Sequence, residues 1–256
     1  MHDLIVAAAQ LVATPRDVLR NVQRHARLAS LAADDGAQMV IFPELSLTSY
    51  DLRLTTDDAL TPDDVRLRPL SRIARERDIV IVAGGPVAVS GGLSIGAMAF
   101  HPSGESTTYL KQYPTATEQA TFIPGPGPVT LTIGGDVVGL AICADVGHPE
   151  HSREAAERGA TVYAAGSLLS VEGYAEDAAR LQGYAAEHRM LALVANYGAP
   201  AGGYVSAGRS AAWSNDGELL ASAPPSGEAL VVAERMGGRW AARIVVVDGA
   251  AADSAA

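Results

Sequence analysis

The 256-residue sequence has a single cysteine, Cys143, and no long apolar run. One cysteine excludes a disulfide framework within the chain and favours a reducing compartment, so we expect a cytoplasmic protein. The longest apolar stretches, such as 137–143, are far shorter than the ~20 residues that span a bilayer. Residues 1–10 have no basic segment of the kind that begins a signal peptide. The sequence therefore predicts neither a membrane segment nor secretion.

Charged residues are also scarce, at 19% of the sequence, whereas hydrophobic residues make up 48%. This composition excludes a disordered or low-complexity chain. The 29 acidic residues outnumber the 19 basic ones, which gives a net charge of −10. A surface this acidic repels nucleic acids and anionic lipids, so we expect neither as a partner. We predict one domain over residues 1–249, followed by a disordered tail at 250–256.

Lysine is the other rare residue, because Lys111 is the only one among the 19 basic residues. Arginine is used wherever a cation only has to face water. A lysine ammonium is a compact charge with three donors, which differs from the planar fork of arginine. The single lysine indicates either a specific task for Lys111 or a genome that favours arginine, and the count alone leaves both open.

Hydrophobic periodicity predicts about a dozen strands and four main helices. The expected strands are 4–9, 39–42, 79–83, 95–100, 106–111, 129–133, 137–142, 161–164, 191–195, 210–213, 219–222, 229–235 and 240–247, and the expected helices are 15–35, 61–77, one from about 149, and 175–188. Helix–strand alternation mixed with hairpins predicts an α/β protein with mixed sheets. So many strands exceed one doubly wound sheet, and we therefore expect two sheets packed face to face with helices outside.

Three chemically useful residues each stand at the end of a predicted strand. Glu44 follows the second strand, Lys111 ends the fifth, and Cys143 precedes a turn into a helix. Partial desolvation raises the pKa of a carboxyl group toward that of a general base. A thiol on a strand-to-helix turn has backbone N–H groups near it that can stabilise an oxyanion. An inert buried cysteine, a solvated glutamate and a surface lysine are the alternatives, and position alone leaves them open.

The order of these residues resembles the carbon–nitrogen hydrolase, or nitrilase, superfamily. The similar segments are Phe-Pro-Glu-Leu at 42–45, Tyr-x-Lys at 109–111 with Glu118 seven residues on, and Gly-x-x-Ile-Cys-x-Asp at 139–145 before Pro-Glu at 149–150. Each motif is weak singly, but all three occur in the family's order and use the only lysine and the only cysteine. The resemblance extends over nearly the whole chain. It implies a four-layer α-β-β-α sandwich that forms a homodimer or a higher homo-oligomer.

The resemblance also implies the roles of the site residues. Glu44 is expected as the general base, Lys111 as the cation that stabilises the oxyanion, and Cys143 as the nucleophile. Glu118 is expected to orient Lys111 and the substrate, and the backbone N–H of Ala144 to be the second oxyanion donor. The predicted reaction cleaves the C–N bond of a small carboxamide substrate through a thioester, with no metal or organic cofactor.

Specificity is less constrained, and we expect Tyr50, His148 and Glu172 to join Ala144 in substrate binding. Many members have Lys-x-His where this chain has Lys-Gln-Tyr at 111–113, and nitrilases have Trp-Glu after the cysteine where this chain has Ala-Asp. These departures favour an amide over a nitrile. The alternatives are an N-carbamoyl (ureido) amidohydrolase, a nitrilase, and a non-catalytic or redox-sensing member of the fold.

Two further patterns compete with this interpretation. Gly-Leu-Ser-Ile-Gly at 92–96 matches the serine-hydrolase elbow, which needs a helix after the serine, whereas residues 97–100 are strand-like. Asp145, His148, Glu150 and His151 have ligand chemistry, but their spacing fits no standard zinc pattern. We therefore predict neither a serine nucleophile nor a metal site.

Overall fold

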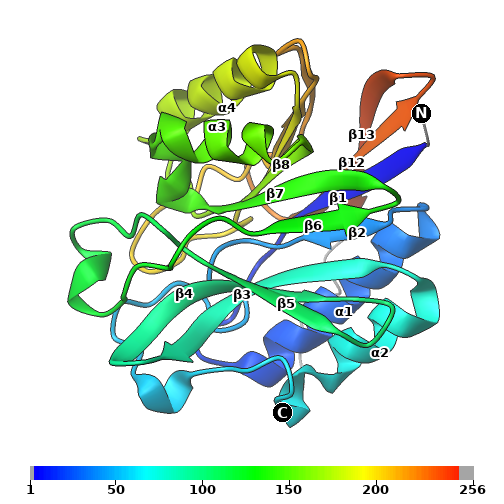
Figure 1. Cartoon of the computed structure of the whole chain (residues 1–256). Helices are drawn as coiled ribbons and strands as arrows, with labels where there is room; N and C mark the ends of the chain where they lie inside the picture. Colours follow the sequence, from blue (N-terminus) through cyan, green and yellow to red (C-terminus); the bar gives the residue numbers. More distant parts are fainter. Residues whose placement is uncertain (1–2, 248–256) are drawn as a thin grey trace.

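The computed structural model describes residues 3–247. The predicted disordered tail, 250–256, lies outside these residues. The strands form two sheets that pack against each other, with two helices on each outer face (Figure 1). The α/β fold class and the α-β-β-α layer order expected from the sequence are therefore confirmed.

The first sheet has seven strands in the order β13-β12-β1-β2-β3-β4-β5. They are β1 (Leu4–Gln10), β2 (Met39–Ile41), β3 (Val80–Val89), β4 (Gly92–Phe100), β5 (Ser106–Leu110), β12 (Glu228–Met236) and β13 (Arg239–Val247). Strands β1, β2 and β3 are parallel, and the other neighbours are antiparallel. Helices α1 (Val18–Asp34) and α2 (Arg68–Arg77) cover the outer face, since their apolar side chains share one core cluster with these strands.

The second sheet has six strands in the order β11-β10-β9-β8-β7-β6. They are β6 (Thr130–Ile133), β7 (Asp136–Ile142), β8 (Ala160–Gly166), β9 (Leu191–Ala195), β10 (Ala211–Trp213) and β11 (Leu219–Ser222). Helices α3 (Pro149–Glu157) and α4 (Tyr174–His188) pack on its outer face. The 3-10 turns are η1 (Thr56–Asp58), η2 (Val65–Leu67), η3 (Glu118–Ala120) and η4 (Cys143–Gly147). Two of them, η3 and η4, carry predicted site residues.

The inner faces of the two sheets share a third apolar cluster, to which Ile41, Val138 and Val231 contribute. Buried apolar surface of this kind is the main favourable term in folding, at about 25 cal/mol per Å². Strand β2 of the first sheet and strand β7 of the second both end next to this layer. The packed core therefore holds the loops that follow them. No helix within residues 3–247 is both long and apolar enough to cross a membrane.

The predicted third strand is wrong in length, because β3 continues past Ala83 to Val89. Gly84-Gly85-Pro86 has the composition of a strand break, but Gly84 lies inside the strand for a packing reason. A Cβ atom on Gly84 would lie 2.3 Å from a carbonyl oxygen of the loop after β2. The turn falls instead at residues 90 and 91, where Gly91 has φ +91°, so β4 begins at Gly92 rather than at Ile95.

The helix predicted from Thr61 begins only at Arg68. Residues 65–67 form η2, whose first turn is capped by the Asp64 carboxylate. Pro69 explains the difference, since proline lacks an N–H and its ring clashes with the preceding turn of a continuous helix. It is tolerated in the first turn of α2, where N–H groups have no helical partner.

Gly139 provides a test of the packing between β7 and α3. A Cβ atom there would lie 2.7 Å from the Cβ of Ala155. We expect Gly139→Ala to lower the free energy of unfolding by about 1–3 kcal/mol, because the helix must move. Gly183 in α4 is the matched control, since a Cβ atom there meets nothing within 4 Å. Gly183→Ala should raise the free energy of unfolding by up to about 1 kcal/mol. Urea titration measures both, and effects of the same sign would contradict this packing argument.

Candidate active site

Glu44 lies in the loop after β2, with 1% of its surface exposed. The hydroxyl of Tyr197 donates to the Glu44 carbonyl oxygen at 2.6 Å. One glycine from each sheet admits the loop: besides Gly84 of β3, Gly166 of β8 would place a Cβ atom 2.4 Å from the carbonyl oxygen two residues before Glu44. Leu45 has φ +50°, a conformation that costs a branched residue energy and that persists where the surroundings enforce it. The position of this carboxylate is therefore fixed from several sides.

Helix α1 supports the same loop from outside the sheet. Nδ1 of His25 donates to the Asn21 carbonyl at 2.7 Å, because a carbonyl oxygen only accepts. Nε2 therefore accepts from the Ser46 hydroxyl at 2.9 Å, and Ser46 Oγ accepts from the Gly84 N–H at 3.2 Å. Burial lowers the pKa of His25 to about 4, so the ring stays neutral, as this chain of hydrogen bonds requires. The Asn21 amide also donates to the Leu47 carbonyl at 3.0 Å.

Lys111 directly follows β5 and is 1% exposed. Its Nζ lies 2.6 Å from Glu44 Oε1 and 2.9 and 2.8 Å from the two carboxylate oxygens of Glu118. The Tyr50 hydroxyl donates to Glu118 Oε1 at 2.9 Å, and the Thr115 N–H donates to Oε2 at 2.7 Å. The structure thus brings Glu44, Lys111, Glu118 and Tyr50, all predicted from the sequence, into one buried cluster.

Burial and charge give the members of this cluster different titration behaviour. Burial raises the pKa of Glu44 to about 7, although the Lys111 charge opposes the shift. Burial alone would lower the pKa of Lys111, but the combined charges of Glu44, Cys143 and Glu118 raise it. Burial would raise the pKa of Glu118, whereas the charge and hydrogen bonds of Lys111 lower it overall. The cluster therefore holds a stable cation, a stable carboxylate and one carboxyl group that titrates near neutral pH.

Cys143 is half-buried between β7 and α3 and begins η4, as expected for a residue on a strand-to-helix turn. Its φ of +45° lies in the left-handed region, and its Sγ is 3.6 Å from the Leu168 carbonyl oxygen. A hydrogen bond with the Cys143 thiol is the smallest of the contributions to the pKa of Glu44, and it lowers that pKa. Burial and then the Glu44 charge raise the pKa of Cys143 well above its usual value, so the resting thiol is protonated.

The remaining predicted substrate-binding residues lie in different surroundings. Ala144 is the second residue of η4, where N–H groups have no partner within the turn. His148 instead stacks on Tyr113, with ring centroids 3.8 Å apart. Glu172 is exposed just before α4. Among the hydrogen bonds and ion pairs of residues 3–247, neither His148 nor Glu172 contacts Glu44, Lys111 or Cys143.

The sequence does not identify the residues that hold Glu44, and no local pattern could have done so. Tyr197 is 153 residues away from Glu44 along the chain. The serine of the competing elbow pattern, Ser94, is buried within β4 and donates to the Ile123 carbonyl at 2.6 Å. It is not followed by a helix, and the elbow pattern is therefore excluded.

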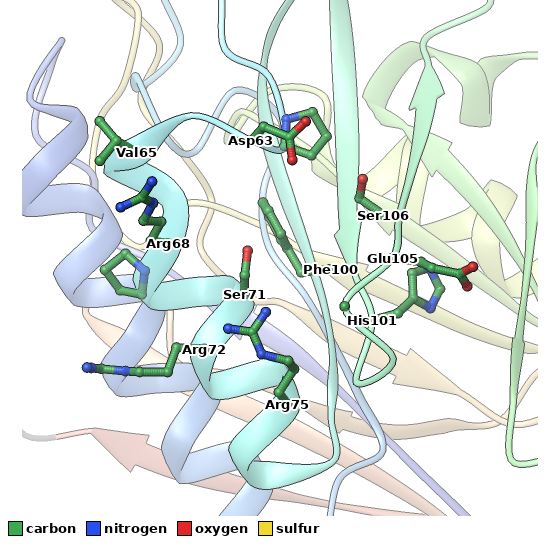
Figure 2. A pocket seen from close by; sticks show the side chains of 13 residues that line it. Asp63, Val65, Arg68, Ser71, Arg72, Arg75, Phe100, His101, Glu105 and Ser106 are labelled. Carbon is green, nitrogen blue, oxygen red and sulfur yellow. The ribbon is translucent and has the colours of Figure 1, made fainter.

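A groove of about 750 Å³ lies between α2 and the β4–β5 hairpin (Figure 2). Figure 2 shows Arg68, Ser71, Arg72 and Arg75 on the helix, opposite Phe100 and Ser106 of the strands. None of Glu44, Lys111, Glu118 or Cys143 lines it. This groove is therefore separate from the cluster around Lys111.

Comparison with known proteins agrees with this geometry. An (R)-stereoselective amidase from Pseudomonas sp is 28% identical over 218 residues, which cover 84% of this chain and 79% of the relative. A nitrilase from Pyrococcus abyssi is 29% identical over 221 residues, covering 84% and 83%. A variant of the amidase from Nesterenkonia sp. AN1 in complex with butyramide is 27% identical, with a TM-score of 0.81 over 92% of each chain.

Another variant of the Nesterenkonia amidase shows covalent addition of the acetamide moiety of fluoroacetamide at its active-site cysteine, with 28% identity and a TM-score of 0.80. The profile of the Carbon-nitrogen hydrolase family matches residues 5–242 of this chain. This match runs from the second residue of β1 into β13 and includes every residue of the Lys111 cluster. The chain therefore belongs to the carbon–nitrogen hydrolase family.

Proposed function

We propose that this protein is an amidase that hydrolyses small, non-peptide carboxamides through a thioester on Cys143. The observation that carries the proposal is the buried Lys111 ammonium, held between Glu44 and Glu118 beside the cysteine thiol. Burying a charge is costly unless it is paired, so a cation in this place indicates a task that needs one. The amidase relatives support the reaction class.

Glu44 acts as the general base in the first step. Its carboxylate takes the proton of the Cys143 thiol while the sulfur attacks the carbonyl carbon of the amide. A pKa of about 7 suits this role, because the same group can then both accept and return a proton near neutral pH. Lys111 bonds to Oε1, whereas Oε2 has no hydrogen bond within the described residues and is available for this proton.

Lys111 and the Ala144 N–H stabilise the oxyanion that forms at the carbonyl oxygen. Glu118 keeps the ammonium in place through two hydrogen bonds. When the C–N bond breaks, Glu44 gives its proton to the departing nitrogen, which leaves as ammonia. Water then attacks the thioester, with Glu44 again taking a proton, and releases the carboxylic acid and the free thiol.

The surface beside the cluster favours a neutral, apolar acyl group. The Tyr204 ring packs edge-on against Tyr50, with centroids 6.0 Å apart. The Val171 N–H donates to the carbonyl oxygen of Val205 at 2.9 Å. Tyr204, Val205 and Val171 are each exposed by 43% or more, and they form an apolar rim beside Tyr50. An N-carbamoyl amino acid carries a carboxylate that such an apolar rim would not stabilise. We therefore place simple amides ahead of ureides as substrates.

Ammonia release from butyramide, propionamide and several N-carbamoyl amino acids tests the reaction class. We expect the protein to release ammonia from the simple amides and to prefer them over the ureides. Cys143→Ala should abolish release while leaving the unfolding curve close to that of the wild type, because it removes one partly buried sulfur atom. Ammonia release that survives in this variant would contradict a thiol mechanism, and a preference for ureides would contradict the substrate class.

The pH dependence of kcat/KM tests the role of Glu44. Because only the carboxylate accepts the thiol proton, kcat/KM should rise as the pH increases through about 7 and then level off. The negative charge of Glu118 contributes to raising the pKa of Glu44, so Glu118→Gln should move this rise to lower pH while reducing the plateau. Initial rates with butyramide between about pH 5 and about pH 9 give both profiles. A rise that moves to higher pH in Glu118→Gln would contradict this assignment.

A further inference from the structure

The two oxyanion donors of the proposed mechanism come from different sheets. Lys111 follows β5 of the seven-stranded sheet, whereas Ala144 follows β7 of the six-stranded sheet. Both must reach one substrate oxygen, and an oxyanion donor works only within hydrogen-bond distance of that atom. Some group must therefore fix the turn after β7 relative to the segment around Lys111.

The Asp145 carboxylate makes this connection. Its Oδ1 accepts from the backbone N–H groups of Gln112 and Tyr113, at 3.1 and 3.0 Å. Its Oδ2 accepts from the Ile142 N–H at 2.9 Å and from the Tyr109 hydroxyl at 2.7 Å. The residue is fully buried. One carboxylate thus binds both flanks of Lys111 and the residue that precedes Cys143.

A second row of hydrogen bonds fixes the direction of this contact. Tyr109 gives its one hydroxyl proton to Asp145 Oδ2, which accepts it. His151 must then donate from Nε2 to the Tyr109 oxygen at 2.8 Å, and its Nδ1 accepts from the Tyr163 hydroxyl at 2.8 Å. This arrangement requires a neutral ring, and burial lowers the pKa of His151 accordingly. His151 and Tyr163 belong to α3 and β8, so the network anchors Asp145 in the core of the second sheet.

We propose that Asp145 is a positioning residue that sets the spacing between Lys111 Nζ and the Ala144 N–H. It touches neither the substrate nor the sulfur in this role. The inference rests on the proposed amidase mechanism, since it assigns to Asp145 the alignment of the two oxyanion donors. The activation of the thiol depends on Glu44 and is independent of this alignment.

Asp145→Asn changes the hydrogen bonding with little change in shape. All four groups that face the carboxylate donate to it, whereas an asparagine amide offers one accepting oxygen and one donating nitrogen. In either orientation the amide nitrogen faces at least one backbone N–H, so one of the two segments must shift. We expect kcat for butyramide to fall by about 10²- to 10³-fold, the usual effect of losing one oxyanion donor.

Two thiol reagents distinguish the alignment of the two oxyanion donors from the activation of the Cys143 thiol, because only one of them needs those donors. Methyl methanethiosulfonate has no carbonyl group: the Cys143 sulfur displaces methanesulfinate to form a mixed disulfide, and the thiol proton goes to Glu44. Butyraldehyde does require the oxyanion donors: the sulfur adds to the carbonyl carbon, the thiol proton goes to Glu44, and the oxygen carries the resulting negative charge. Protection of Cys143 by the aldehyde against the thiosulfonate gives its dissociation constant without any turnover.

In Asp145→Asn we expect the rate of thiosulfonate modification to stay within about threefold of the wild type, whereas aldehyde affinity falls by about 10- to 100-fold. Tyr109→Phe removes one of the four hydrogen bonds to Asp145 and should give a smaller shift in the same direction. It also keeps the test available if Asp145→Asn does not fold. Asp136→Asn, at the opposite end of β7 and also buried, is the matched control and should leave both reagents unaffected even where stability falls.

Equal losses with both reagents in Asp145→Asn and Tyr109→Phe would overturn the positioning role, since they indicate a general structural defect. Unchanged aldehyde affinity in both variants would overturn it as well. If the wild type binds the aldehyde at Cys143 but hydrolyses neither amides nor ureides, the proposed function fails while the alignment by Asp145 is still measured by the aldehyde. A wild type that does not bind the aldehyde overturns both.

Discussion

The pairing of the Lys111 ammonium with two carboxylates is the constraint on which the rest of the site depends. Removing a charge from water costs several kcal/mol, and only close partners offset that cost. Glu44 and Glu118 supply them at 2.6 to 2.9 Å, from the loop after β2 and from η3. The chain must therefore bring three distant segments to one point. Without Glu118 the ammonium would keep only Glu44, a carboxyl group that titrates near neutral pH, so the pairing with both groups preserves the electrostatics of the site.

The sandwich distributes the reacting groups between its two sheets. Glu44 and Lys111, the proposed base and oxyanion cation, follow strands of the seven-stranded sheet, and Cys143 follows a strand of the six-stranded sheet. Two of the positive-φ residues outside glycine belong to this region, namely Cys143 and Leu45, which directly follows Glu44. Gly84 and Gly166 leave room for the Glu44 loop, because a side chain at either position would collide with its backbone. The core of the sandwich thus holds the proposed reacting groups in a fixed arrangement, which is the condition for electrostatic stabilisation of a transition state.

The layer order and the three main site residues could be predicted from the sequence, because these residues directly follow buried strands that end abruptly. Glu44, Lys111 and Cys143 were each identified at a strand end, and the family resemblance gave the layer order. The contacts that hold them could not be predicted. Tyr197 and His25 act across long separations in the chain, and the four donors that meet Asp145 come from two sheets. The sequence underestimated the length of β3, because Gly84 is required by close packing against the loop after β2 and does not mark a turn. The homo-oligomeric state and the cytoplasmic location stay predictions.

The central claim is that a thiol from one sheet attacks a carbonyl group held by a cation from the other, which requires an acyl-enzyme on Cys143. Acid quenching of the wild-type protein during turnover of butyramide, with and without hydroxylamine, followed by mass spectrometry, tests this most directly. We expect a butyryl adduct confined to the peptide that contains Cys143, and butyryl hydroxamate when hydroxylamine intercepts it. Ammonia release with neither an adduct nor a hydroxamate at any quench time would contradict the account.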